Sequence, residues 1–213
     1  MITRIIDTHH EPLSAVARQA AVVLAAGGIV AVPTDTVYGL AARADDDRAV
    51  ARLFVVKQRR DDNPLPILIA DESALERAAS DVPEAARRLA QRFWPGPLTI
   101  VLPKSHAVSD LVSAGRPTVG VRVPDHPVAR AVLAACDFLV AVTSANLSAL
   151  DPAREADEVR RDFSGKIELI LAADRCPGGV PSTVVELSGG AMRILRAGAI
   201  SAAQLEAALR ADA

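Results

Sequence analysis

Short apolar segments alternate with helix-like segments along nearly the whole chain, and this alternation limits the fold more than any other feature of the sequence. Helices are predicted over residues 14–26, 45–57, 73–80, 83–93, 126–135 and 157–163, with one more after Ser201. Apolar runs of strand length predict strands over residues 29–32, 66–70, 98–102, 118–124, 138–142, 167–172, 182–187 and 192–196. We therefore predict an α/β fold, with one domain over residues 1–213 in which helices flank a twisted mixed β-sheet.

Several helix ends carry local stop and start signals. Gly27-Gly28 is expected to end the first helix, because glycine supplies the left-handed residue that follows a helix. The carboxylates Asp45–Asp47 predict a cap at the start of the helix that runs to about Lys57. Ser73–Glu76 and Asp81–Glu84 have the spacing of capping boxes. His126 lies before a proline at the start of another predicted helix, so we interpret it as a capping residue.

The composition excludes several classes of protein. Half of the residues are hydrophobic and the net charge is -2, so a large core is possible and no overall basic field attracts nucleic acid. Aromatic residues make up only 3%, which argues against a base-stacking platform. Cys136 and Cys176 fit no metal-binding spacing, and we expect two buried, inert thiols in a reducing compartment. Without a signal-peptide core or an apolar run near the ~20 residues of a membrane helix, the chain is predicted to be cytoplasmic.

The common catalytic signatures are absent from the sequence. It contains no GxxxxGK followed by Ser or Thr, no GxGxxG, no HExxH and no GxSxG, and its four histidines do not form a metal-binding set. A P-loop, an ordinary dinucleotide site and a serine-hydrolase elbow are therefore not predicted.

A cationic segment, Lys57-Gln58-Arg59-Arg60, lies between a helical run and an apolar strand. Lysine offers a compact charge with three donors, while arginine offers a flat fork that grips two oxygens at once. Lys57 and Arg59 together would suit several phosphate oxygens. The alternative is a solvated helix end, where cations offset the negative end of the helix dipole.

Small polar side chains follow two of the predicted strands. Thr34 and Asp35 come after the strand at 29–32, and Ser144 and Asn146 come after the strand at 138–142, where α/β proteins often place ligand loops. The alternative is that these residues cap turns. Arg122 lies inside an apolar strand and shares a face with Thr118, so it needs either an anionic ligand or a buried carboxylate as its partner.

Hydroxyls and cations thus recur at strand ends, and their convergence would form a pocket for an anionic ligand with no strong nucleophile. Such a pocket favours a reaction run by positioning and charge neutralisation, such as attack on a phosphate of ATP. The residues concerned are Thr34, Lys57, Arg59, Thr118, Arg122, Ser144, Asn146, Ser182 and Arg196.

The ordered set of motifs resembles the YrdC-like family, the L-threonylcarbamoyladenylate synthases. The resemblance covers nearly the whole chain, and the extra C-terminal domain of longer relatives is expected to be missing. It rests on Pro33-Thr-Asp-Thr-Val-Tyr-Gly-Leu40, Lys57-x-Arg59 with Asn63-Pro-Leu65, Trp94-Pro-Gly-Pro-Leu-Thr99, Val121-Arg-Val-Pro124 with His126-Pro127, Ser144-Ala-Asn146, Ser182-Thr-Val-Val185 and Leu195-Arg-x-Gly198.

The resemblance implies a concave basic cleft and a reaction in which L-threonine, bicarbonate (or CO2) and ATP give threonylcarbamoyl-AMP and pyrophosphate, with Mg2+. Another enzyme, or a complex, then transfers the threonylcarbamoyl group to the adenosine beside the anticodon of tRNA. Lys57 and Arg59 are the implied catalytic residues. ATP would be held by Lys57, Arg59, Thr118, Ser144, Asn146 and Arg196, and threonine by Thr34, Arg122 and Ser182.

The chain departs from the family pattern at Leu68, where many relatives have histidine, and at Arg60 and Ala149. A solvated surface role is expected for Arg60. Gly178-Gly179 is the expected hinge if a lid closes over the site. The rival hypothesis is a non-catalytic module of the same fold that docks double-stranded RNA or the ribosome.

Overall fold

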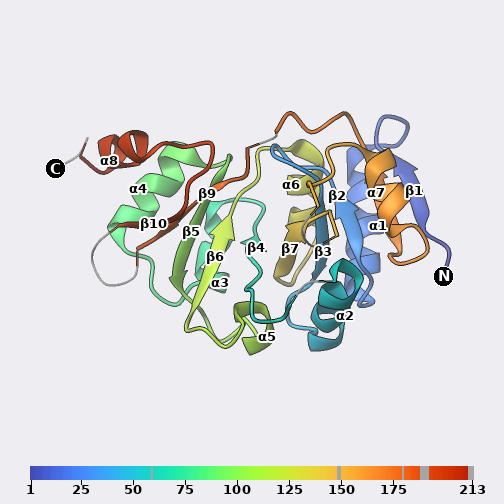
Figure 1. The fold of residues 1–213 in the computed structure, drawn as a ribbon, viewed down its shortest axis with the longest axis horizontal. Helices are drawn as coiled ribbons and strands as arrows, with labels where there is room; N and C mark the ends of the chain where they lie inside the picture. Colours follow the sequence, from blue (N-terminus) through green and yellow to red (C-terminus); the bar gives the residue numbers. More distant parts are fainter. Residues whose placement is uncertain (59, 148–149, 179, 188–191, 211–213) are drawn as a thin grey trace.

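The computed structural model describes residues 1–213 with the exception of 59, 148–149, 179, 188–191 and 211–213. Within the described residues, ten strands join in one sheet in the order β1-β8-β2-β3-β7-β4-β6-β5-β9-β10 (Figure 1). The strands are β1 (Arg4–Asp7), β2 (Val30–Val32), β3 (Gly39–Arg43), β4 (Ile67–Leu68), β5 (Leu98–Pro103), β6 (Thr118–Arg122), β7 (Val140–Ser144), β8 (Leu169–Ala172), β9 (Thr183–Glu186) and β10 (Arg193–Arg196).

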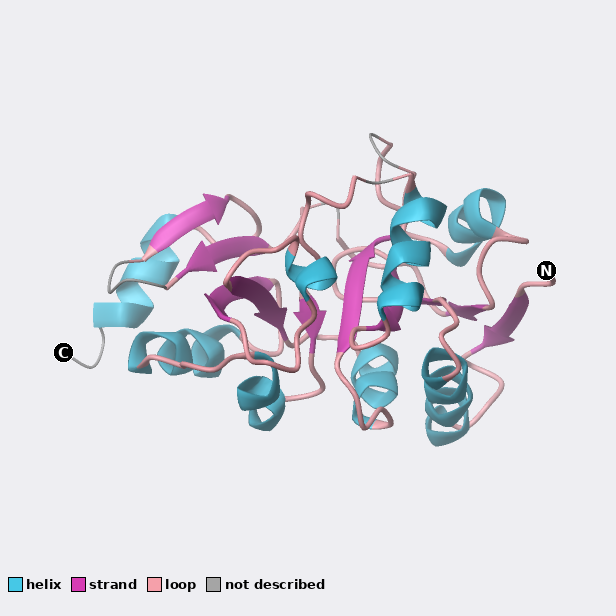
Figure 2. Ribbon diagram, turned by 90° about the horizontal axis from the view of Figure 1, so that it is seen from below, coloured by secondary structure: helices cyan, strands magenta, loops and turns pink. Residues whose placement is uncertain are grey.

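Helices lie on both sides of this sheet (Figure 2). They are α1 (Leu13–Ala25), α2 (Asp47–Lys57), the 3-10 turn η1 (Glu72–Ala74), α3 (Leu75–Ala78), α4 (Glu84–Phe93), α5 (Asp110–Ser113), α6 (Pro127–Ala134), α7 (Ala156–Phe163) and α8 (Ala202–Arg210). None of the helices described is long and apolar enough to cross a membrane, and α1, with 13 residues, is the longest.

The pairing of the strands is mixed, as predicted. β1, β8 and β2 are parallel, while β2, β3, β7 and β4 follow one another in antiparallel pairs. β4 pairs with β6 and β5 with β9 in parallel, and β6–β5 and β9–β10 are antiparallel. In the β3–β7 pair, Gly39 lies opposite Ser144. The loop that connects β2 to β3 therefore ends beside the end of β7.

The two faces of the sheet bury separate cores. Helices α1 and α6 pack on one face through residues such as Val16, Leu24 and Val132, against Val30 and Val140. The helices of the opposite face, α2, α3, α4, α5, α7 and α8, bury the larger cluster. These two apolar layers fix the strands whose ends carry the polar residues of the candidate site.

Strand β6 shows the predicted alternation. Val119 and Val121 are buried in the larger core, so Thr118, Gly120 and Arg122 point to the other face. A side chain at Gly120 would bring its Cβ within 3.0 Å of the Thr99 Cγ2 atom of β5. Glycine at this position therefore leaves no side chain on the sheet surface between Thr99 and Arg122.

Some local predictions hold and others are wrong. Asp46 caps α2 by accepting from the Arg48 and Ala49 amides, and the His126 side chain caps α6. The capping box predicted at Ser73 is wrong, because Asp71 is the cap and Ser73 donates to it. The box predicted at Asp81–Glu84 is also wrong, since Pro83 precedes α4 and has no side-chain oxygen.

Two strands were not predicted from the sequence. β1 lies at the edge of the sheet, and three of its four residues are exposed. Only Ile5 and Ile6 are apolar, so the sequence there has no apolar run of strand length. β3 begins with Gly39 and contains two alanines, and its first four residues are buried, so it shows no alternation. Both strands are formed by pairing with distant neighbours rather than by a local signal.

Candidate functional site

Lys57 lies at the end of α2 and contacts the Ser144–Asn146 turn at the end of β7. The Lys57 Nζ atom donates to the Ser144 carbonyl at 2.6 Å and to the Asn146 Oδ1 atom at 2.7 Å. It also lies 3.2 Å from the Ser144 Oγ atom and 2.9 Å from the Asn146 carbonyl. We call Lys57, Ser144 and Asn146 the lysine group. Its two motifs are 87 residues apart in the sequence, and the fold brings them into direct contact.

The solvated-helix-end alternative is wrong for Lys57, whose exposed fraction is only 3%. Its position in the last turn of α2 favours a cation there, because the helix dipole is negative at that end. Arg60, by contrast, is exposed and lies 2.8 Å from Asp62, as expected for a surface residue. Arg59, the other predicted catalytic residue, lies outside the described residues.

Local backbone contacts orient the Ser144–Asn146 turn. The Ala145 amide donates to the Tyr38 carbonyl at 2.7 Å, which ties the turn to the start of β3. The Ser144 hydroxyl donates to Asn146 Oδ1 at 2.6 Å, and the Asn146 side-chain amide donates to the Leu147 and Leu150 carbonyls. The Oδ1 atom of the Asn146 side chain is therefore held toward Lys57.

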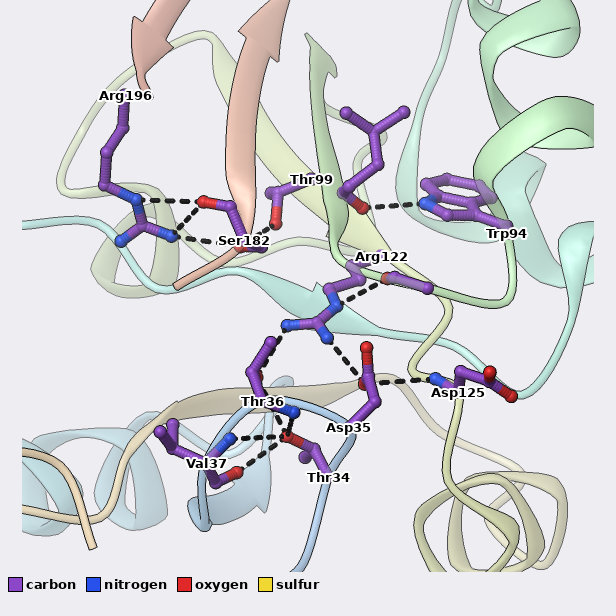
Figure 3. Close-up of polar contacts among 12 residues, drawn as sticks. Thr34, Asp35, Thr36, Val37, Trp94, Thr99, Arg122, Asp125, Ser182 and Arg196 are labelled. Carbon is purple, nitrogen blue, oxygen red and sulfur yellow. Dashed lines mark hydrogen bonds and ion pairs between the residues drawn. The ribbon is translucent and has the colours of Figure 1, made fainter. Parts of the chain in front are cut away.

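Arg122 points from β6 into a buried set of acceptors (Figure 3). Its Nη2 atom lies 2.6 Å from Asp35 Oδ1, its Nη1 atom donates to Thr36 Oγ1 at 3.2 Å, and its Nε atom donates to the Gly96 carbonyl at 2.9 Å. The Arg122 and Asp35 side chains are 8% and 12% exposed. Burial lowers the pKa of Arg122, and the Asp35 charge opposes that shift.

Of the two partners expected for Arg122, the structure therefore shows the buried carboxylate. Asp35 is not a cap of its own turn, because its Oδ1 atom accepts from Arg122 and from the Asp125 amide, 90 residues away. Sequence reasoning missed this role, although a buried arginine in β6 signals that a carboxylate must lie near it.

Thr34 organises the loop between β2 and β3. Its hydroxyl donates to the Val37 carbonyl at 2.6 Å and accepts from the Thr36 and Val37 amides. Gly178 packs against this loop so closely that a Cβ atom there would lie 1.9 Å from the Thr36 carbonyl oxygen. The loop is thus shaped from within by Thr34 and from outside by the segment that precedes β9.

Ser182 and Arg196 complete this side of the candidate site. The Ser182 hydroxyl lies 2.9 Å from Thr99 Oγ1, and Arg196 donates to the Ser182 carbonyl through Nε at 3.1 Å and Nη2 at 2.8 Å. Burial and the nearby charge of Arg122 lower the pKa of Arg196. We call Thr34, Asp35, Thr36, Arg122, Ser182 and Arg196 the arginine group.

One loop joins the two groups. Residues 33–38 carry Asp35 and Thr36, which contact Arg122, and end at Tyr38, whose carbonyl accepts from Ala145 beside Asn146. Thr118 lies on the Arg122 face of β6 and is half-buried. A concave basic cleft around these residues stays a prediction.

The remaining candidate chemistry is inert in this fold. Cys136 and Cys176 are free and buried, as predicted. Burial raises the pKa of both thiols, that of Cys136 to about 11, so neither is a ready nucleophile at neutral pH. Leu68, where many members of the family have histidine, packs into the core under α1 and α6.

The chain is similar to known proteins over most of its length. Residues 22–198 match the Sua5_yciO_yrdC family model, described as "Telomere recombination". The threonylcarbamoyl-AMP synthase of Pyrococcus abyssi is 44% identical over 84% of this chain, and the putative threonylcarbamoyl-AMP synthase of Mycobacterium tuberculosis H37Rv is 35% identical over 88%.

The crystal structure of P. abyssi Sua5 complexed with L-threonine superposes with a TM-score of 0.92 at 42% identity, covering 97% of this chain and 61% of that one. The chain spans 53% of the P. abyssi relative but 86% of the mycobacterial one. The match extends over more than half of the chain in sequence and nearly all of it in structure. The chain therefore belongs to the Sua5/YciO/YrdC family, in agreement with the resemblance of its motifs.

Proposed function

We propose that this chain is a threonylcarbamoyl-AMP synthase, which forms threonylcarbamoyl-AMP and pyrophosphate from L-threonine, bicarbonate or CO2, and ATP. The observation that carries the proposal is the contact between Lys57 and the Ser144–Asn146 turn, two family motifs that meet in a buried site. Supporting evidence comes from relatives named threonylcarbamoyl-AMP synthase and from a Sua5 structure with L-threonine. The chain spans about half of the P. abyssi relative, and the proposal is that this portion is sufficient for the reaction.

The lysine group is the proposed site for the ATP phosphates and ribose. The four oxygens of Ser144 and Asn146 that contact the Lys57 Nζ atom are neutral, so these contacts orient the ammonium group without cancelling its charge. An ammonium held in this way is organised in advance for a phosphate oxygen. Arg59, Thr118 and Arg196 are proposed to add further contacts to the nucleotide.

The arginine group is the proposed site for threonine. Each Nη atom of Arg122 donates one hydrogen bond to the described part of the protein. Each also has a second N–H group, which can donate a hydrogen bond to the substrate carboxylate. Thr34 and Ser182 supply hydroxyls that are both at most 5% exposed. The placement of these residues on one loop, one strand and one neighbouring turn supports a small amino-acid site.

In the proposed reaction, the threonine nitrogen bonds to the carbon of CO2 and loses a proton. An oxygen of the resulting carbamate then attacks the α-phosphorus of ATP, and the bond from that phosphorus to the bridging oxygen breaks. Pyrophosphate leaves with the electron pair of that bond. Lys57 and Arg59 would neutralise the charge that develops on pyrophosphate.

The described residues include no group of three His, Cys, Asp or Glu side chains that could hold a metal ion. The predicted Mg2+ would help Lys57 and Arg59 to neutralise the charge that develops on the leaving pyrophosphate. Any magnesium would enter with the phosphates of ATP.

The test is release of pyrophosphate by the purified chain with ATP, L-threonine and bicarbonate. We expect release only when all three are present, together with a new adenylate. Pyrophosphate release that does not depend on threonine would contradict the proposed enzyme activity. Folded protein that binds RNA but releases no pyrophosphate would favour the non-catalytic module. The product would be used by a threonylcarbamoyl transferase complex that modifies tRNA at position 37, in the cytoplasm.

A further inference from the structure

Two charged atoms of the arginine group have no partner among the residues that the structure describes. Asp35 accepts both of its bonds, from Arg122 and from the Asp125 amide, at Oδ1, which leaves Oδ2 open. Arg196 makes all of its bonds to Ser182 through Nε and Nη2, which leaves Nη1 open. The arginine group thus offers a negatively charged hydrogen-bond acceptor, Asp35 Oδ2, and a positively charged hydrogen-bond donor, Arg196 Nη1.

The position of Asp35 is fixed by its neighbours. Its side chain is 12% exposed, and Arg122 and Asp125 hold Oδ1 from β6 and from the loop that follows it. Thr36, the next residue, is also bonded to Arg122, so the loop cannot rotate Asp35 away without breaking two contacts. The open oxygen is therefore a fixed group on the surface of the site (Figure 3).

This pattern of charges matches a zwitterion. An α-amino acid carries a carboxylate, which suits guanidinium N–H groups, next to an ammonium group, which suits a carboxylate oxygen. A buried arginine alone would select any small carboxylic acid. The adjacent Asp35 oxygen adds a requirement for an N–H donor on the carbon next to the carboxylate.

We infer that Asp35 is a specificity-determining residue, whose Oδ2 atom accepts a hydrogen bond from the α-amino group of the substrate while Arg122 faces its carboxylate. The inference rests on the proposed function, because it concerns the amino-acid half of that site. It explains why the carboxylate that holds Arg122 uses only one of its two oxygens for the protein. It also directs the substrate nitrogen, the atom that takes up CO2, to one fixed place.

The test compares L-threonine with 3-hydroxybutanoate, which keeps the carboxylate and the hydroxyl but has no amino group. Binding of each to the wild-type chain, Asp35→Asn and Thr36→Val is followed by NMR titration. Loss of a charge-assisted hydrogen bond predicts that Asp35→Asn binds L-threonine about tenfold more weakly, or worse. Its affinity for 3-hydroxybutanoate should not fall, because that ligand does not use the Oδ2 atom and the loss of the Asp35 charge leaves the Arg122 charge more available to a carboxylate.

Thr36→Val is the matched control, since it removes another bond to Arg122 from the same loop but no charge. We expect it to change the affinity for both ligands by the same factor. Asp35→Asn that keeps the wild-type preference for L-threonine, weakens both ligands equally, or binds neither while still binding ATP would overturn the inference. A wild-type chain that does not bind L-threonine at all would instead overturn the proposed function.

Discussion

The ammonium group of Lys57 lies 2.7 Å from the side-chain oxygen of Asn146, although the two residues are 89 positions apart. This contact joins the last turn of α2 to the end of β7. It also means that Lys57 has two roles, because it shapes the turn that it is proposed to share with ATP. Substitutions in the lysine group are therefore expected to change both stability and activity.

Replacing Lys57 by Ala should reduce threonine-dependent pyrophosphate release to background, because it removes the buried charge that is proposed to face the phosphates of ATP. The substitution also removes the Lys57 donor from the buried backbone carbonyls of Ser144 and Asn146, which costs about 1–3 kcal/mol of folding free energy. A pyrophosphate assay and urea unfolding measure the two effects. Arg60→Ala is the matched control, because Arg60 is exposed and pairs with the nearby Asp62 on the surface; it should behave as wild type. A fully active Lys57→Ala would contradict the proposed role.

Replacing Ser144 by Ala should weaken ATP binding about tenfold with little change in threonine binding. The Ser144 hydroxyl donates to Asn146 Oδ1 and lies 3.2 Å from Lys57, so its removal loosens the two partners that face the nucleotide. The measurement is the KM for each substrate in the pyrophosphate assay. Equal increases in both KM values would show that Ser144 does not act on the nucleotide side alone.

Replacing Asp35 by Ala should destabilise the protein by about 3–5 kcal/mol, because Arg122 would remain buried without a counter-charge. Substituting Arg122→Met in the same chain should recover much of that stability, since the unpaired charge is removed, while activity stays lost. Urea unfolding of the single and double variants measures this coupling. A double variant as unstable as the sum of the two singles would contradict a direct interaction between the charges.

Stability should fall at alkaline pH as buried acids resist ionisation. Burial raises the pKa of Cys136 from 9.0 to about 11 and that of Tyr38 from 10.0 to about 12. Between each pair of values the unfolded chain has lost a proton that the folded chain keeps, so the free energy of unfolding decreases as pH rises. The effect of Cys136 begins near pH 9 and levels off above about 11. Urea unfolding from pH 7 upward measures it.

Cys136→Ala is the control for the alkaline loss, because it removes one of the two buried thiols whose pKa is raised from 9.0 and leaves Cys176 in place. The variant should show a shallower decrease in stability between pH 9 and 10, below the pKa of the Tyr38 hydroxyl in both states. An identical slope in the variant and the wild type would mean that burial of the Cys136 thiol does not control the loss.

Local patterns of amino acids were sufficient to predict the parts of the fold that depend on neighbouring residues. The Asp46 and His126 caps and the alternation of Thr118, Gly120 and Arg122 with the core valines of β6 could all be predicted, because each depends on a spacing of a few residues. The ordered motifs likewise identified the family.

Only the tertiary structure decided which partners these residues have. The sequence allowed Arg122 either an anionic ligand or a buried carboxylate, and Asp35 became known as that carboxylate only when the loop after β2 was placed beside β6. Lys57 could be solvated or buried until α2 was packed beside the end of β7. Both contacts span 87 residues, and no local spacing encodes them, because their free energy depends on how the whole sheet is assembled.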